Sequence, residues 1–345
     1  MTKQSVLGLK QEILESLSAE SQSRIGTEAQ GLVSPNVERR LAVGYSQLSK
    51  KDFWLELRVQ RGKGTAYRKA EEIKEKACGE ANIEIIPRIE IPSKSAVHQL
   101  TRKKKQLTKR IRPLHMGLSV GHLDGGVGTL GAFIDTPKGE AVLSNNHVLA
   151  MMGRAELDDP IFQPGKEDKP RLYSSDRIAR LATFSEISRE DPNEVDSAIA
   201  LLLNGVEHDS NKIPEGLDFP MEGKMIRDID GFDLLEKHKV VCKIGRTTGF
   251  TTGLISAVAL DRVPVWTPIG NVLFNNVIEI SWESSRKPFS KPGDSGSLVF
   301  TKKELAAVGL HFAGGVKQIN RREVGISYSC NLATVLADYS ASLLE

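Results

Sequence analysis

The chain has 345 residues, of which 39% are apolar and 26% are charged, and its formal net charge is +3. This length allows about two domains, and the ordinary apolar fraction excludes a wholly disordered chain. No run of about 18 apolar residues occurs, so we expect no membrane-spanning helix and no membrane partner.

The start of the chain and its cysteines predict the compartment. The first residues, MTKQSVLGLKQEILESLSAESQSRI, lack the apolar stretch of about 7–15 residues that a secretory signal needs. The three cysteines, Cys78, Cys242 and Cys330, are too few and too widely spaced for a disulfide framework. We therefore expect reduced thiols and a cytoplasmic location.

The first third of the chain predicts a helix followed by a small α+β module. Apolar residues at helical spacing mark residues 1–30 as an N-terminal helix, and the order β-β-α-β marks 36–95 as the module. The expected elements are a helix over 4–25, strands over 40–48 and 53–59, a helix over 65–81, and a strand over 82–91 that Pro87 makes an edge or a bulge. The module is either a packing appendage or a recognition surface for a regulatory partner, and the residues do not separate these.

A basic run follows the module. Residues 1–112 carry a net charge of +10 and residues 113–345 carry −7. Residues 96–112 are interpreted as a solvated linker, because they lack interleaved aromatics on which bases stack and no nucleic-acid-binding motif accompanies them. We therefore expect no nucleic-acid partner, although association with nucleic acid through this basic run stays an alternative. The basic side chains are Arg102, Lys103, Lys104, Lys105, Lys109, Arg110 and Arg112.

The remaining residues, 113–345, have the sequence pattern of one β-rich domain. Short β-forming runs alternate with Gly, Pro, Asn and Asp turns, which is typical of a sandwich or barrel. The last residues, 333–345, have helical spacing and predict a closing helix.

The sharpest chemical signal is Gly293-Asp294-Ser295-Gly296-Ser297, a glycine-flanked serine in a turn that enters a strand. Acyl transfer needs an exposed nucleophile beside backbone N–H groups that hold an oxyanion. In isolation the motif is equally consistent with a polar turn.

A second signal is His147, which follows the strand-like run GEAVLS and precedes an apolar Val-Leu-Ala turn. An imidazole near neutrality suits a general base. A third is Asp196, at the mouth of the apolar run 197–202. A buried carboxylate is costly unless it is paired, and an imidazole N–H is a natural partner.

Together the three residues occur in the order His, Asp, Ser, which is one of the chain orders known for the nucleophilic triad. The motifs GTLGAFI, LSNNHVLA, DSAIA, KIGRTTGFTTG, KPGDSGSLVF and GLHFAGG accompany them. On these motifs the chain resembles the trypsin-like serine peptidases, and in particular an intracellular bacterial branch. The resemblance spans about 117–330 and implies a chymotrypsin-like double β-barrel, so the expected fold class is mainly β, with the α+β module in front.

The resemblance also implies the roles of individual residues. Ser295 matches the nucleophile, His147 the general base and then acid, and Asp196 the group that orients the imidazole. The amides of Gly293 and Ser295 match the oxyanion hole. Asp294 matches an Asp that receives a new N-terminus after activation cleavage in secreted members, but no Ile-Val-Gly-Gly-like start precedes GTLGAFI, so we expect no such cleavage.

The expected substrate pocket contains Phe289 at its base, with Ser290, His311 and Gly314. An Asp at position 289 would attract Lys or Arg, and it is absent, so we expect cuts after Glu or a medium apolar residue. The sequence thus predicts a serine endopeptidase that forms an acyl-enzyme on a protein or peptide substrate, in regulatory or defence-type processing, with no cofactor and no metal. The alternatives are a catalytically inactive binding protein on the same fold and a nucleic-acid-associated protease that uses the basic run.

Overall fold

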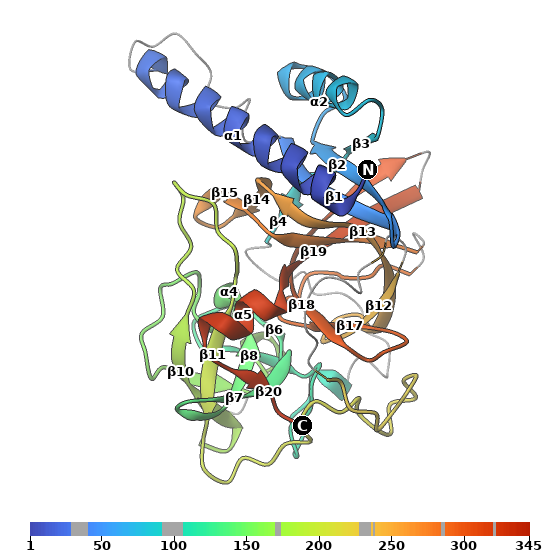
Figure 1. Cartoon of the computed structure of the whole chain (residues 1–345). Coiled ribbons are helices and arrows are strands. Elements are labelled where there is room, and N and C mark those ends of the chain that lie inside the picture. Colours follow the sequence, from blue (N-terminus) through green and yellow to red (C-terminus); the bar gives the residue numbers. More distant parts are fainter. Residues whose placement is uncertain are drawn as a thin grey trace.

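The computed structural model describes residues 1–28, 41–91, 106–169, 174–227, 236, 239–283, 287–319 and 322–345. Strands dominate, and they form two barrels that lie side by side beneath an N-terminal layer (Figure 1). The mainly β fold class predicted from the sequence is confirmed. None of the described helices is long and apolar enough to cross a membrane.

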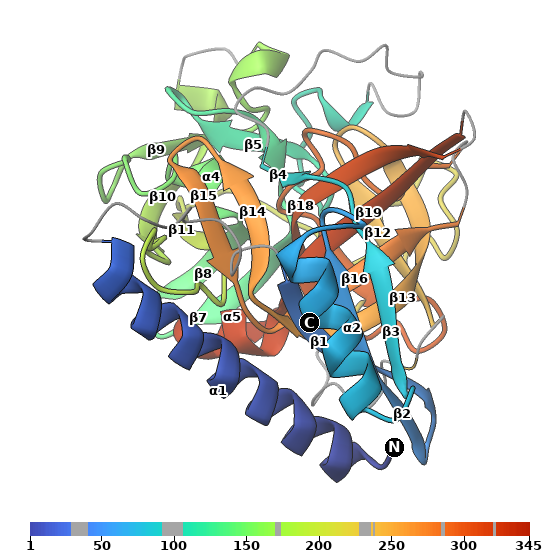
Figure 2. The ribbon, with the colours of Figure 1, turned by 90° about the horizontal axis from the view of Figure 1, so that it is seen from above.

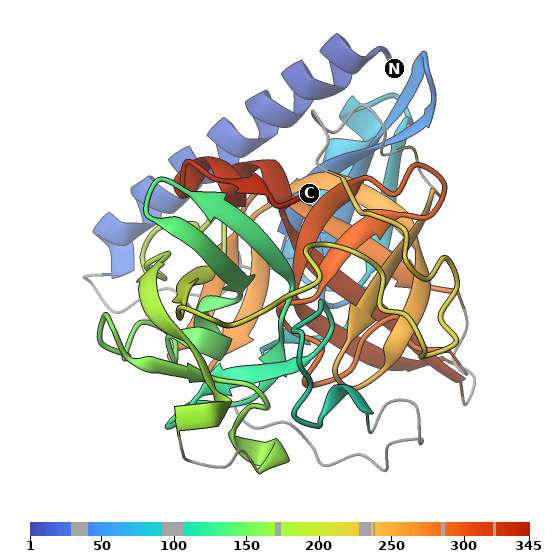
Figure 3. The same cartoon turned by 90° about the horizontal axis from the view of Figure 1, so that it is seen from below.

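The first barrel is an open one. Its sheet has the order β20-β7-β8-β11-β10-β9-β5-β6, and Figure 3 shows it in green beside the orange and red strands of the second barrel. Short helices lie in its loops: α4 (Asn146–Leu149), η2 (Lys166–Asp168) and η3 (Ser174–Asp176). The strands are β5 (Ser119–His122), β6 (Gly128–Thr129), β7 (Ala132–Thr136), β8 (Gly139–Ser144), β9 (Pro160–Phe162), β10 (Arg177–Phe184) and β11 (Ala198–Leu202).

The second barrel is closed, because its strands pair in the ring β12-β13-β16-β19-β18-β17 and back to β12. Side chains along β13 alternate in burial over much of its length, as expected for a strand with one face in a core. A hairpin of β14 (Val263–Thr267) and β15 (Gly270–Phe274) leaves the barrel after β13. The ring strands are β12 (Val240–Gly245), β13 (Gly249–Asp261), β16 (Val277–Trp282), β17 (Leu298–Thr301), β18 (Ala307–Ile319) and β19 (Arg322–Asn331).

The N-terminal layer contains the predicted helix and the predicted β-β-α-β order, and these elements are confirmed. Helix α2 is shorter than expected, because Cys78 and Gly79 adopt positive φ and end it. Strand β1 pairs with β2 and also with β13, so the sheet of the module continues into the second barrel. The elements are α1 (Lys3–Glu28), β1 (Leu41–Ser49), β2 (Asp52–Val59), α2 (Thr65–Lys76) and β3 (Ala81–Ile85).

The module and the second barrel also share one hydrophobic core. Val43 and Leu57 of the module lie in the same buried cluster as Ile255 and Ile280 of the barrel. We call this cluster the junction core. At about 25 cal/mol per Å² of apolar surface removed from water, such a shared cluster couples the stability of the two parts. The division into domains at 36–95 and 113–345 stays a prediction. Strands from both of these ranges belong to one continuous sheet.

A buried charge network crosses the same junction. The Arg58 guanidinium on β2 donates from Nε to Glu279 Oε1 and Oε2 on β16 at 2.9 and 3.0 Å, and from NH1 to Glu56 Oε2 at 2.9 Å. Tyr328 donates to Glu279 Oε2 at 2.6 Å. The Arg58, Glu56 and Glu279 side chains are at most 1% exposed.

The strand predicted over 82–91 is in fact two strands. Strand β3 ends at Ile85, and Pro87 interrupts the pairing before β4 (Ile89–Glu90) begins, since proline lacks the N–H that a ladder needs. Strand β3 belongs to the module, whereas β4 crosses to the second barrel and lies between β14 and β18 (Figure 2).

The C-terminal helix is shorter than predicted. Asn331 caps α5 (Leu332–Asp338) by accepting a hydrogen bond from the Ala333 N–H at 3.0 Å. Ser340 adopts φ 49°, which ends the helical path, and β20 (Ser342–Leu343) then pairs with β7.

The described end of the basic run packs on the first barrel. Arg110 Nε donates to Asp176 Oδ1 at 2.8 Å, and Arg112 NH1 donates to Gln163 Oε1 at 2.5 Å. Arg102 and residues 103–105 lie outside the described residues, so the linker prediction stays untested there.

Candidate active site

The imidazole of His147 is held by a buried carboxylate. His147 lies on α4, directly after β8, and Asp196 lies directly before β11, which pairs with β8. His147 Nδ1 and Asp196 Oδ2 are 2.5 Å apart, and the His147 backbone N–H donates to Oδ1 at 3.2 Å. The Asp196 carboxylate is fully buried. An ionised Asp196 accepts the Nδ1 proton, which leaves the Nε2 lone pair free to take a proton.

Two neighbours fix Asp196 in turn. Asn145 Nδ2 donates to the Asp196 carbonyl at 2.6 Å, and the Asp196 N–H donates to Cys330 Sγ at 3.3 Å. Burial, followed by the negative charge of Asp196, raises the pKa of the Cys330 thiol. Cys330 is therefore an uncharged acceptor here, and the described cysteines are all free thiols.

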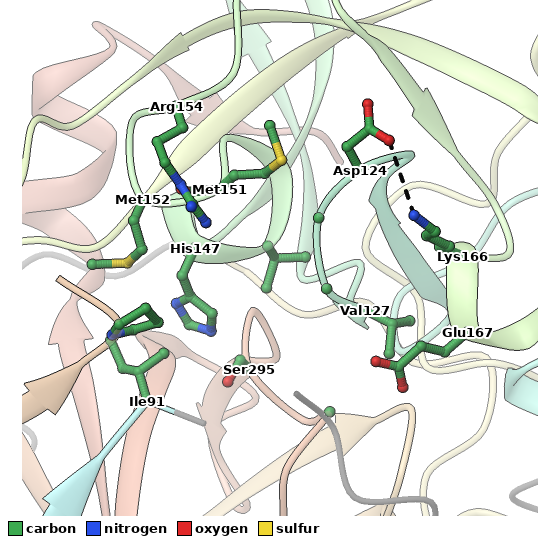
Figure 4. Close-up of a pocket in the computed structure, with 15 residues that line it drawn as sticks. Ile91, Asp124, Val127, His147, Met151, Met152, Arg154, Lys166, Glu167 and Ser295 are labelled. Atoms are coloured by element: carbon green, nitrogen blue, oxygen red, sulfur yellow. Dashed lines mark hydrogen bonds and ion pairs between the residues drawn. The ribbon is translucent and has the colours of Figure 1, made fainter. Parts of the chain in front are cut away.

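Ser295 comes from the other barrel, in the turn before β17. It lines a cleft of about 380 Å³ together with His147, Gly293 and Ile91 (Figure 4). Its hydroxyl donates to the Phe312 carbonyl at 3.4 Å, and within the described residues no hydrogen bond joins it to His147. Such bonds are often long in unliganded enzymes and tighten when substrate binds.

The turn before Ser295 presents two backbone amides. Thr247 Oγ1 donates to the Pro292 carbonyl at 2.8 Å, so the Gly293 N–H of the same trans peptide points the opposite way. The Gly293 and Ser295 amides donate to no protein group in the described part of the chain. Gly293 adopts φ 96°, a conformation that favours glycine. This arrangement fits an oxyanion hole.

Asp294 turns away from the cleft into a fully buried ion pair. Lys243 Nζ on β12 lies 3.2 Å from Asp294 Oδ2. The backbone N–H groups of Thr247 and Thr248 donate to Oδ1 at 2.8 and 3.0 Å. Burial alone would raise the pKa of Asp294, but the Lys243 charge and the Thr248 and Lys291 hydrogen bonds lower it below its ordinary value. The Lys243 ammonium therefore pairs with the Asp294 carboxylate and stabilises the turn that carries Ser295. In secreted peptidases of the family that the sequence resembles, a new N-terminus is expected to pair with the matching Asp.

A second cavity, of about 340 Å³, adjoins Ser295. Three of the four predicted pocket residues, Ser290, His311 and Gly314, line it. Phe289 does not; its ring is buried in the junction core and packs edge-on against His311, with centroids 6.3 Å apart.

His311 is uncharged at neutral pH. Burial, followed by the positive charge of Lys243, lowers the pKa of His311 to about 3. Its Nδ1 lies 3.1 Å from the Tyr328 carbonyl, which only an Nδ1–H can use as an acceptor. The Ser290 and Ser327 hydroxyls lie 2.7 Å apart beside it.

The sequence did not single out several residues of the site. Lys243 is the first residue of the motif KIGRTTGFTTG. A charged residue within a β-forming run was the only sequence signal that could have pointed to it. The two cavities are also lined by Glu90 of β4 and by the residues that flank this strand, Arg88 and Ile91. No local pattern predicts that a strand about 200 residues away in sequence reaches the serine.

The fold and the site together define a class: a mainly β, two-barrel protein with a Ser–His–Asp constellation between its barrels. No family model matches the chain, and no curated protein matches it. Among solved structures, a Nocardiopsis protease matches with 15% identity and a TM-score of 0.46, over 67% of this chain and 98% of that one. Thermobifida fusca Protease A matches with 13% identity and a TM-score of 0.44, over 67% and 97%.

A third solved structure is described as "a glutamic acid specific serine protease" that "utilizes a novel histidine triad in substrate binding". It has 16% identity and a TM-score of 0.44, over 67% of this chain and 100% of that one. At these similarities the activities of these proteins are not carried over, and the two-barrel architecture stands on the strand pairing described above.

Proposed function

We propose that the protein is a serine endopeptidase that cleaves protein or peptide substrates through an acyl-enzyme. One observation carries this proposal: His147, Gly293 and Ser295 line a single cleft, and the buried Asp196 carboxylate pairs with the His147 imidazole behind it. His147 and Asp196 come from one barrel and Ser295 from the other, so the site exists only where the barrels meet.

In the proposed reaction Ser295 Oγ attacks the substrate carbonyl while His147 Nε2 takes the hydroxyl proton. Asp196 keeps the Nδ1 proton in place and stabilises the imidazolium. The Gly293 and Ser295 amides hold the negative oxygen of the tetrahedral intermediate. His147 then gives its proton to the leaving amine, and a water repeats the sequence to release the acyl group.

For the residue before the cut we propose Glu or a medium apolar side chain. The pocket contains an uncharged His311 and the Ser290 hydroxyl, and the Lys243 ammonium lies close enough to His311 to lower its pKa. No Asp stands at position 289 to attract a cationic side chain, and the Ser290 hydroxyl can donate a hydrogen bond to a carboxylate. A regulatory or defence-type role and a cytoplasmic location stay predictions from the sequence.

The test is labelling by a small fluorophosphonate, which forms a stable bond only with an activated serine. We expect a single label on Ser295, located by peptide mass spectrometry, and none in Ser295→Ala. Ser342→Ala, which removes an exposed hydroxyl on β20, is the matched control and should label like wild type. A protein that folds but never labels would refute the peptidase and favour the inactive binding protein.

A further inference from the structure

Strand β4 reaches the candidate active site from outside the two barrels. It is only two residues long, Ile89 and Glu90, and the described chain continues to Ile91. Glu90 pairs with Gly314 of β18 in antiparallel register, and Ile89 and Glu90 pair with Val265 and Trp266 of β14 in parallel register. The Ile91 N–H donates to the Trp266 carbonyl at 2.8 Å.

The position of β4 coincides with the wall of both cavities. Arg88 and Glu90 line the cavity that contains His311 and Gly314, and Ile91 lines the cleft that contains His147 and Ser295. Figure 4 shows Ile91 on the side of His147 and Met152. Residues 88–91 therefore line both the cavity that contains His311 and the cleft that contains Ser295.

The side chains of residues 88–91 alternate between solvent and core. Ile89 is fully buried and Ile91 is 4% exposed, both in the core cluster that contains Phe274 and Phe312. Arg88 and Glu90 are 61% and 58% exposed, and Arg88 lies over the Trp266 ring at 4.0 Å. The site thus offers two aliphatic positions separated by one solvated position.

Removing β4 would leave two free main-chain edges facing one slot. Gly314 already pairs with Ser327 of β19 on its other side, and β14 pairs with β15 on its other side. Unpaired strand edges accept an added extended peptide, with backbone hydrogen bonds giving affinity and side-chain pockets giving selectivity. Any extended substrate that reaches Ser295 along Gly314 needs this same slot.

We propose that β4 occupies the place of the substrate strand, so that the enzyme is closed by its own chain until an extended peptide with aliphatic residues at the Ile89 and Ile91 positions displaces it. This inference rests on the proposed peptidase function and concerns the regulation and substrate class of that same site. The shortness of β4 makes the exchange feasible, because few pairings must break.

The loss of apparent substrate affinity caused by such a block follows from the population of the state in which β4 is displaced. A binding-competent state populated at about 0.1–10% weakens apparent substrate binding by the same factor, about 10- to 1000-fold. A small reagent that does not pair with β14 or β18 is not subject to this weakening. Labelling by a small reagent therefore measures the reactivity of Ser295, whereas cleavage of an extended peptide also measures how often β4 is displaced.

The first experiment compares Ile89→Ser with wild type in the full chain. We expect Ile89→Ser to raise kcat/KM on a fluorogenic peptide carrying Ile-Glu-Ile by at least about tenfold, while still labelling with the small fluorophosphonate. Ile83→Ser is the matched control: it changes the same residue type on β3, away from both cavities, and should leave peptide cleavage at the wild-type rate.

The outcomes separate the two proposals. An Ile89→Ser protein that labels normally but cleaves the peptide no faster than wild type overturns the block by β4 and leaves the peptidase standing. A folded wild-type protein that never labels overturns both. An equal gain in Ile83→Ser attributes the effect to general loosening and also overturns the block.

The second experiment needs no variant. Amide hydrogen exchange of wild type is measured with and without a peptidyl phosphonate that carries isoleucines at alternate positions and is bonded to Ser295. We expect the amides of Glu90 and Ile91 to exchange faster in the adduct, because the ligand takes their partners. Unchanged or slower exchange in the adduct means that β4 is a permanent strand and overturns the proposal.

Discussion

The two barrels supply one site but are built differently. The first holds His147 and Asp196. Among the described strands, its sheet contains β5 to β11 and one strand from the end of the chain, β20. The second holds Ser295, and its sheet continues through β13 into β1, β2 and β3. Two buried ion pairs lie in this half: Lys243 with Asp294 beneath Ser295, and Arg58 with Glu279 where the module joins the barrel, all at most 1% exposed. The Lys166–Asp124 pair on the first barrel has side chains that are 52% and 75% exposed.

This difference teaches where the molecule is sensitive. A buried ion pair adds little net stability, yet removing one partner leaves an unpaired charge and is strongly destabilising. Exposed pairs contribute little. The half that carries Ser295 should therefore be sensitive to the loss of Lys243 or Arg58, whereas loss of the exposed Lys166–Asp124 pair should have little effect.

The largest expected effect is on turnover, where the barrels act as one unit. His147→Ala should lower kcat by a factor on the order of 10⁶, as in a well-studied triad enzyme. Asp196→Asn should cost about 10⁴, because the amide favours the wrong imidazole tautomer. Steady-state kinetics on a peptide substrate, with circular dichroism to confirm folding, checks both. A His147→Ala protein with wild-type turnover would remove the triad.

The next effect concerns the ion pair beneath the nucleophile. Lys243→Met leaves Asp294 buried without its cation and should destabilise the protein by about 3–5 kcal/mol. The double variant Lys243→Met/Asp294→Asn should recover part of this loss, because no charge is then stranded. Urea unfolding measures both. Equal stability of Lys243→Met and wild type would contradict the importance of this pair.

A third prediction sharpens the contrast between the barrels. Arg58→Met strands Glu279 and Glu56 at the junction and should cost about 3–5 kcal/mol. Lys166→Met, which removes one partner of the exposed Lys166–Asp124 pair on the first barrel, should cost at most about 1 kcal/mol. If both variants unfold at the same urea concentration, the two barrels do not differ in the way described.

A fourth prediction follows from the lowered pKa of Asp294. Because its folded pKa lies below its unfolded value of about 3.9, Asp294 contributes stability above that pH. The contribution is lost as pH falls through the folded value. Wild type should therefore lose stability below about pH 4, and Lys243→Met/Asp294→Asn should lose less over the same window. Identical acid-unfolding curves would refute this.

The smallest expected effect is on selectivity. His311 is uncharged above its pKa of about 3, so a Glu substrate held by a cationic His311 must bring a proton with it. The ratio of kcat/KM for Glu over Gln peptides should then fall about tenfold per pH unit as pH rises. A ratio that is constant from about pH 6 to 8 would show that hydrogen bonds from groups such as Ser290 hold the side chain alone.

Local pattern predicted most of the elements and singled out the three residues that are proposed as a triad. His147, Asp196 and Ser295 stand out because each lies at a strand end in a short motif, and motifs are local. Arg58 and Lys243 did not stand out, since a charged residue in a strand usually marks a solvated face. Their burial depends on partners that the fold brings from far along the chain, such as Glu279 for Arg58, 221 residues away.

The same long-range pairing explains the remaining differences. The sequence predicts one β-rich domain over 113–345, and in the structure β1 supplies a neighbour to β13 while Leu57 lies in one buried cluster with Ile280. A chain shortened to 113–345 is therefore expected to expose the junction core. Phe289 was placed in the substrate pocket by resemblance alone, and packing against β16 neighbours turns it inward.

The continuous sheet also has a consequence for synthesis on the ribosome. Strand β1 leaves the ribosome long before β13, its partner across the junction, has been translated. At about 5–20 residues per second, the outer edge of β1 and the apolar face of the module wait for roughly 10–40 seconds before their partner strands appear. The nascent chain therefore exposes this apolar surface to aggregation until the second barrel has been translated.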